Sequence, residues 1–197
     1  MDTIHLQGRE YDEIENTVTD LFEDLGFTEF PVSCFEVASK LKIELKKYSE
    51  VPEDEREFFV SKYEDGYSLN LGKFKYVIYY NDKINSDRIR YTIWYEIGHI
   101  QLGHHDRLDK SQGRMKTEAN HFAVFAQAPM PAVILSEPYN QFDISSTFNL
   151  SLECAENVYS TYRKVTIYPS TVRKILNKRI LSVLDFSKVR KKKCVCV

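Results

Sequence analysis

Glu96 and His99 lie three residues apart in the stretch WYEIGHIQLGHH, which runs from Trp94 to His105, and could act together on a metal ion. In the motif H-E-x-x-H, a helix presents two imidazoles one turn apart to one zinc ion, and the glutamate takes a proton from metal-bound water. Here Tyr95 stands where that motif has its first histidine. A glutamate and a histidine at this spacing are common on helix surfaces, so the pair alone is weak evidence of a site.

Two helices are expected to position these residues. The first covers residues 85–103, because one apolar stripe recurs at helical spacing: Ile89, Ile93, Ile97 and Ile100. The second is indicated by Ala119, Phe122, Ala123 and Ala126, and the prolines at 129 and 131 should end it.

A small antiparallel sheet is predicted before these helices. Apolar residues alternate over 43–45, 57–63, 67–72 and 75–81, and Asp65-Gly66 is typical of a tight hairpin turn. Apolar residues also recur at helical spacing over 14–25, 33–41, 151–164 and 170–184, which predicts further helices there. Ser151 fits a helix cap better than a nucleophile. The pattern as a whole predicts an α+β fold.

Composition indicates a folded protein of ordinary domain size. The 197 residues are 43% hydrophobic and 28% charged, without low-complexity segments or repeats. No secretory signal or membrane-spanning segment is evident, and the four cysteines lack the density of a disulfide framework, so we expect a cytoplasmic protein.

Charge is distributed unevenly along the chain. Residues 1–60 carry 16 acidic and 6 basic side chains (net −10), residues 61–162 carry 12 and 10 (net −2), and residues 163–197 carry 1 and 11 (net +10). A basic end of this kind is typical of a solvated helix face. The alternative is contact with an acidic partner or with nucleic acid through the C-terminal segment, although no nucleic-acid motif supports it.

Two spaced motifs resemble those of the ImmA/IrrE family of metallopeptidases. Its H-E-x-G-H helix corresponds to Tyr95-Glu96-Ile97-Gly98-His99 followed by Leu102-Gly103-His104, and its E-A-N-x-F-A helix with Met-Pro corresponds to Glu118-Ala119-Asn120, Phe122-Ala123 and Met130-Pro131. The flanks PVSCFEVASKLKIELKKYS and FNLSLECAENVYSTYRK are similar as well, so the likeness covers roughly residues 30–165.

This resemblance implies a zincin-like core, with helices around a small antiparallel sheet, over residues 1–135. A helical C-terminal segment at 136–187 and a basic, cysteine-containing tail at 188–197 would follow. It implies zinc as the cofactor, His99 and Glu118 as ligands and Glu96 as the general base. It also implies a protein substrate, since such proteins, often carried by phages and other mobile elements, relieve repression by cleaving a helix-turn-helix repressor.

Tyr95 leaves the remaining zinc ligand open. A phenol binds metal well only as phenolate, and its usual pKa is near 10, so Tyr95 could instead be a packing residue over a disabled site. It could also act directly, as a ligand or a hydrogen-bond donor. His121, one turn after Glu118, is another candidate ligand, and His104 and His105 are lesser ones.

Two Glu-x-x-His patterns, here Glu96 with His99 and Glu118 with His121, are also a feature of di-iron carboxylate bundles. The predicted sheet and the lack of two further glutamates argue against a di-iron site in this chain. We therefore expect a zinc endopeptidase that cleaves or inactivates a helix-turn-helix repressor or another regulatory protein. The alternative is an inactive pseudopeptidase that acts by binding alone.

Overall fold

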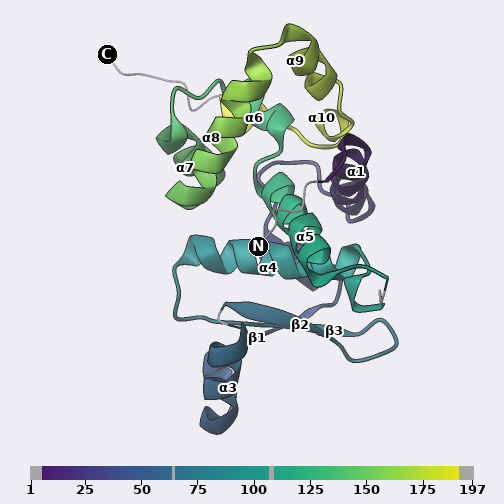
Figure 1. Ribbon diagram of the computed structural model, residues 1–197, viewed down its shortest axis with the longest axis vertical. Helices are drawn as coiled ribbons and strands as arrows, with labels where there is room; N and C mark the ends of the chain where they lie inside the picture. The colour runs from purple at the N-terminus through teal and green to yellow at the C-terminus, as the bar shows by residue number, and fades with distance from the viewer. Residues whose placement is uncertain (1–5, 64, 107–108, 191–197) are drawn as a thin grey trace. The chain divides into compact units, whose positions relative to one another are not determined.

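The computed structural model describes residues 6–63, 65–106 and 109–190 and is mainly helical, with one small sheet (Figure 1). The chain forms two compact units. Unit 1 contains residues up to Thr17 and Ser33–Ala123, and unit 2 contains Val18–Val32 and the chain from Val124 onward. Helices α1 (Gly8–Asp24) and α5 (Gln112–Gln127) contribute residues to both units.

Unit 1 is built on a mixed sheet of three strands. These are β1 (Glu44–Lys47), β2 (Gly66–Asn70) and β3 (Tyr76–Tyr80), in the order β1-β3-β2. β2 pairs antiparallel with β3, whereas β1 pairs parallel with it. The expectation of an antiparallel sheet is therefore wrong for one of the two pairings. A chain segment long enough for a crossover, residues 48–75, separates the parallel strands.

Residues 57–63, predicted as a strand, instead belong to helix α3 (Glu53–Tyr63), which follows the short 3-10 helix η1 (Tyr48–Glu50). Pro52 and the acidic residues after it favour a helix start. The Arg56 guanidinium holds the entry to this helix by donating to three backbone carbonyl oxygens, those of Tyr48, Ser49 and Val51. Asp65-Gly66 consequently leads into β2, and the hairpin turn lies at 71–75.

Helices complete unit 1: α2 (Cys34–Lys40), α4 (Ser86–Gln101), the 3-10 helix η2 (His104–Asp106) and the first part of α5. Figure 1 shows α4 along one face of the sheet and α3 on the other side of it. The predicted helices at 85–103 and around Ala119 are confirmed as α4 and α5. Ile93 and Ile97 of α4 are fully buried, so this helix is firmly seated where it carries Glu96 and His99.

Unit 2 is helical. It contains α6 (Met130–Ser136), α7 (Gln141–Phe148), α8 (Leu152–Thr166), α9 (Pro169–Leu176), α10 (Ile180–Val183) and α11 (Ser187–Arg190). The Ser151 hydroxyl accepts from the Cys154 amide at the start of α8, which confirms its role as a cap. Most of the basic tail, residues 191–197 with Cys194 and Cys196, lies outside the described residues. Within the described ranges, no helix is both long and apolar enough to cross a membrane.

Candidate functional site

Glu96 is a buried carboxyl group held by the neighbouring strand. It lies on α4 and is only 7% exposed. The hydroxyl of Ser68, in β2, donates to Glu96 Oε2 over 2.6 Å. Burial raises the pKa of Glu96 to about 6, although the hydrogen bonds from Ser68 act in the opposite direction. Glu96 therefore titrates just below neutral pH, which suits a group that takes up and releases a proton.

Ser68 connects Glu96 to a histidine that the sequence analysis regarded only as a lesser candidate. The Ser68 hydroxyl oxygen lies 3.0 Å from His105 Nε2. Since this hydroxyl donates its proton to Glu96, it accepts from His105 Nε2–H. The Tyr76 ring packs 5.7 Å from the His105 ring, and burial lowers the pKa of His105.

His99 and Glu118 are brought together through a third residue, His104. This histidine is buried, and it follows Gly103, whose φ of 67° directs the chain out of α4 into η2. His104 Nε2 lies 2.9 Å from Glu118 Oε2, and His104 Nδ1 lies 3.0 Å from His99 Nδ1. The two residues that the family resemblance names as ligands thus lie at opposite ends of a hydrogen-bonded chain.

The direction of the first bond in this chain follows from Glu118. An ionised carboxylate only accepts, so His104 Nε2–H donates to it. The second bond depends on the protonation state of His104: neutral His104 accepts from His99 Nδ1–H, whereas protonated His104 donates to His99 Nδ1. Only the neutral form of His104 leaves the lone pair of His99 on Nε2, the state in which imidazole binds metal. Burial and the adjacent imidazoles of His104 and His105 lower the pKa of His99 to about 4, so His99 is neutral at pH 7.

Glu118 is neutralised by cations from the chain itself. The Lys110 ammonium lies 2.8 Å from both of its carboxylate oxygens, and Arg114 Nε lies 3.3 Å from Oε1. Burial raises the pKa of Glu118, but the hydrogen bonds and charges of Lys110 and His104 outweigh it, so the pKa is below its usual value. Glu118 is therefore an ionised carboxylate already supplied with positive charge.

Close packing of α4 against α5 sets the separation of the two motifs. A Cβ added at Gly98 would lie 3.1 Å from two ring carbons of Phe122, which is closer than ordinary van der Waals contact. The Tyr91 hydroxyl donates to the side-chain oxygen of Asn120, the third residue of E-A-N. The glycine of one motif and the asparagine and phenylalanine of the other thus serve the helix–helix contact.

The two candidates for the missing ligand have different surroundings. Tyr95 packs edge-on against the His99 ring at 4.8 Å, and burial raises its pKa to about 12. His121 lies on the side of α5 that faces α1: its Nε2 is 3.2 Å from Glu15 Oε1, and its ring is 4.6 Å from that of Tyr11. Tyr95 thus packs against a predicted ligand, His99, whereas His121 pairs with Glu15 of α1.

The side-chain types at this site fit zinc better than their arrangement does. His99, His104 and Glu118 supply two imidazoles and one carboxylate, the ligand types that zinc accepts. However, His104 is bonded on both nitrogens and Glu118 is bonded to Lys110. Among the residues described, no three His, Cys, Asp or Glu side chains are grouped so as to hold one metal ion. A metal at Glu118 would therefore have to displace Lys110.

Comparison with protein families, with curated proteins and with solved structures found no significant match for this chain.

Proposed function

We propose that this chain is a metallopeptidase-like protein with a zincin-like core, which inactivates a regulatory protein by zinc-dependent cleavage in the cytoplasm. The observation that supports it best is the pairing on α4 of a buried carboxyl group, Glu96, with a neutral His99. The helix-turn-helix repressor as substrate, and zinc as cofactor, rest on the resemblance of the two motifs. His99 and Glu118 are the proposed ligands, with Tyr95 or His121 as the third.

In this proposal Glu96 is the general base. Its pKa of about 6 leaves it mostly ionised at pH 7, and it is still basic enough to accept a proton from water. Ser68 holds one carboxylate oxygen and so fixes the direction of the other. Zinc, when bound, would supply Lewis acidity and lower the pKa of that water.

A second candidate is a pseudopeptidase that binds the regulatory protein without cutting it. The Lys110 and Arg114 contacts favour this candidate, because they give Glu118 the positive charge that a metal would otherwise supply. Tyr95 favours it too, since a buried phenol with a pKa of about 12 is a poor ligand at neutral pH.

Zinc stoichiometry distinguishes the two candidates. The protein would be purified without a metal-binding tag, and the wild type would be compared with His99→Ala, Glu118→Ala, His121→Ala and Tyr95→Phe. The cleaving candidate predicts one zinc per chain, lost with His99 and Glu118 and with one of the other two. A wild type that binds no zinc even when zinc is in excess would rule out the cleaving candidate, and only the binding candidate would remain.

Cleavage itself is tested with Glu96→Gln. The peptidase should lose hydrolysis of a co-expressed repressor through this change and still bind it, whereas a pseudopeptidase should inactivate the repressor equally well with either residue.

A further inference from the structure

The turn between β2 and β3, residues 71–75, has an unusual backbone and is here called the hairpin tip. The Lys75 amide donates to the Gly72 carbonyl oxygen over 3.0 Å, which closes a four-residue turn. Its central residues, Lys73 and Phe74, have φ values of 52° and 60°. Two successive left-handed residues are typical of a type I′ turn, where Asn-Gly is strongly preferred and side chains such as Lys and Phe are strained.

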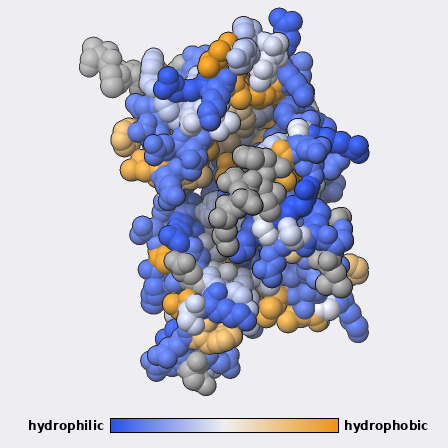
Figure 2. Space-filling model, in the orientation of Figure 1, coloured by the Kyte–Doolittle hydropathy of each residue, from blue (hydrophilic) through white to orange (hydrophobic). Residues whose placement is uncertain are grey.

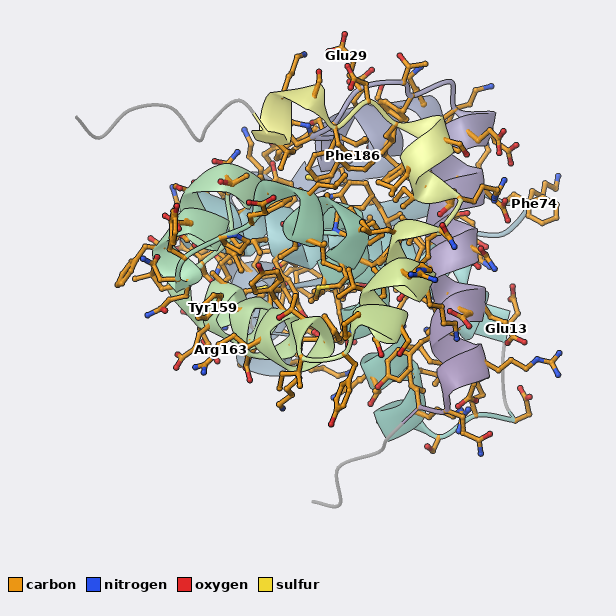
Figure 3. The ribbon with its side chains drawn as sticks, turned by 90° about the horizontal axis from the view of Figure 1, so that it is seen from above. Glu13, Glu29, Phe74, Tyr159, Arg163 and Phe186 are labelled. Carbon is orange, nitrogen blue, oxygen red and sulfur yellow. The ribbon has the colours of Figure 1, made fainter. Side chains whose placement is uncertain are left out.

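The strained residues gain little from the fold in return. Phe74 is 93% exposed, Leu71 is 61% exposed, and Figure 3 shows the Phe74 side chain pointing away from the rest of the molecule. Lys73 and Lys75 are exposed as well, and neither has an ion-pair partner among the described residues. Strain that the fold itself does not require points to a contact with another molecule. The hairpin tip presents that molecule with two apolar side chains and two positive charges.

The complementary surface occurs in the same unit, on α3. Glu53, Glu57 and Val60 follow one another at helical spacing along one side of this helix. All three are exposed, Val60 by 43%. Figure 2 shows apolar and hydrophilic side chains interspersed over α3, at the lower end of the view. Within the described ranges, neither glutamate has an ion-pair partner. Glu53, Glu57 and Val60 are called the α3 face.

We propose that the chain self-associates, with the hairpin tip of one copy docked on the α3 face of a second copy. Two lysines and two apolar side chains would meet two glutamates and the Val60 side chain, so the contact would remove exposed apolar surface and pair all four charges. The contact joins two different patches. If a two-fold axis relates the two copies, the contact forms twice and gives a closed dimer. Without such an axis, each copy binds the next and a chain of copies results.

A membrane is a weaker match for the hairpin tip. Phe74 and Leu71 together offer less apolar surface than a single myristoyl chain, which alone binds membranes only marginally. The glutamates of the α3 face would also be repelled by the anionic lipids that attract lysines. A second copy satisfies both patches at once.

Charge reversal tests the proposal by sedimentation velocity at low salt, with chelated protein at concentrations up to roughly millimolar, where weak contacts are populated. One variant carries Lys73→Glu and Lys75→Glu, and the other carries Glu53→Lys and Glu57→Lys. Each alone should associate on the order of tenfold more weakly than the wild type. An equimolar mixture of the two should associate again, because each hairpin tip then meets an α3 face of opposite charge. Neither zinc nor a substrate is needed, so the result is independent of the proposed peptidase function.

Phe74→Asn separates an interface role from a structural one. Asparagine accepts the left-handed conformation readily, so this variant should melt at the same or a higher temperature than the wild type while associating more weakly. A wild type that stays monomeric throughout the concentration range would overturn the proposal, as would association that ignores the charge reversals. Binding to phosphatidylcholine–phosphatidylserine vesicles that Phe74→Asn abolishes would assign the hairpin tip to membranes and overturn it too.

Discussion

Replacing Glu96 by glutamine should stabilise the metal-free protein near neutral pH. The fold raises the pKa of this carboxyl group from 4.5 to about 6, chiefly by burial, which corresponds to roughly 2 kcal/mol held against the charged form. Glu96 is only 7% exposed, so solvent screens little of this penalty. Glutamine has the same shape and carries no charge, and its side-chain oxygen still accepts from the Ser68 hydroxyl.

The stabilisation depends on pH in a defined direction. Between pH 4.5 and 6 the folded state binds a proton at Glu96 that the unfolded state has released. The wild type therefore loses stability as the pH rises through this window, and the glutamine variant does not. The difference between them should be near zero at pH 4 and complete by about pH 7.5.

Calorimetry in a chelating buffer measures both effects. For a chain of this size, about 2 kcal/mol corresponds to an increase in melting temperature of roughly 4–8 °C. Ser68→Ala is the matched control: it should lower stability at pH 7.5 by about 1.5–3 kcal/mol in the wild type, and by less in the glutamine background, where the acceptor is neutral. A glutamine variant that is less stable at pH 7.5, or a difference that is the same at pH 4, would refute the inference that burial opposes this charge.

Two other substitutions examine the surroundings of the site. Gly98→Ala gains about 1 kcal/mol of helix propensity, but its methyl group would crowd Phe122, and the resulting overpacking of about 1–3 kcal/mol should leave a net loss in thermal melts. A net gain would mean that Phe122 moves aside freely. Lys110→Met removes the ammonium group that lies 2.8 Å from both oxygens of Glu118, so titration calorimetry should show zinc binding severalfold tighter than in the wild type if Glu118 is a ligand. Unchanged affinity would remove Glu118 from the ligand set.

Local periodicity was sufficient to predict the helices that carry the site. The isoleucine stripe of α4 and the alanines of α5 repeat every three or four residues, and all of these residues are buried except Ile89, which is half-buried. The same approach failed at α3, because the aromatic and β-branched run Phe58-Phe59-Val60 is of the composition typical of a strand. The inward residue there is Phe59, whose ring lies 5.1 Å from that of Tyr67 in β2. The packing of this half-buried aromatic ring against the sheet, together with the anchoring of Arg56, outweighed the strand-like composition.

The site was predictable only where motif spacing identified it. Glu96, His99 and Glu118 stand at positions named by the two motifs, whereas Ser68 stands 28 residues before the carboxylate that it holds. His104 was recognised as part of L-G-H, but its hydrogen bond to Glu118 joins two residues that stand 14 positions apart in different helices, η2 and α5. Hydrogen bonds of this kind depend on how strands and helices pack, and no local pattern in the sequence records them.

The pH dependence of zinc affinity decides whether Tyr95 is a ligand. His99, with a pKa of about 4, is deprotonated throughout pH 6–9, and the ionised Glu118 likewise needs to lose no proton. Tyr95, with a pKa of about 12, would have to release one, at a cost of roughly 7 kcal/mol at pH 7. A Tyr95 ligand therefore makes affinity rise about tenfold per pH unit more steeply in the wild type than in Tyr95→Phe. Equal slopes in the two proteins would show that zinc, where it binds, does so without the phenolate, and Tyr95 would then be a packing residue beside His99.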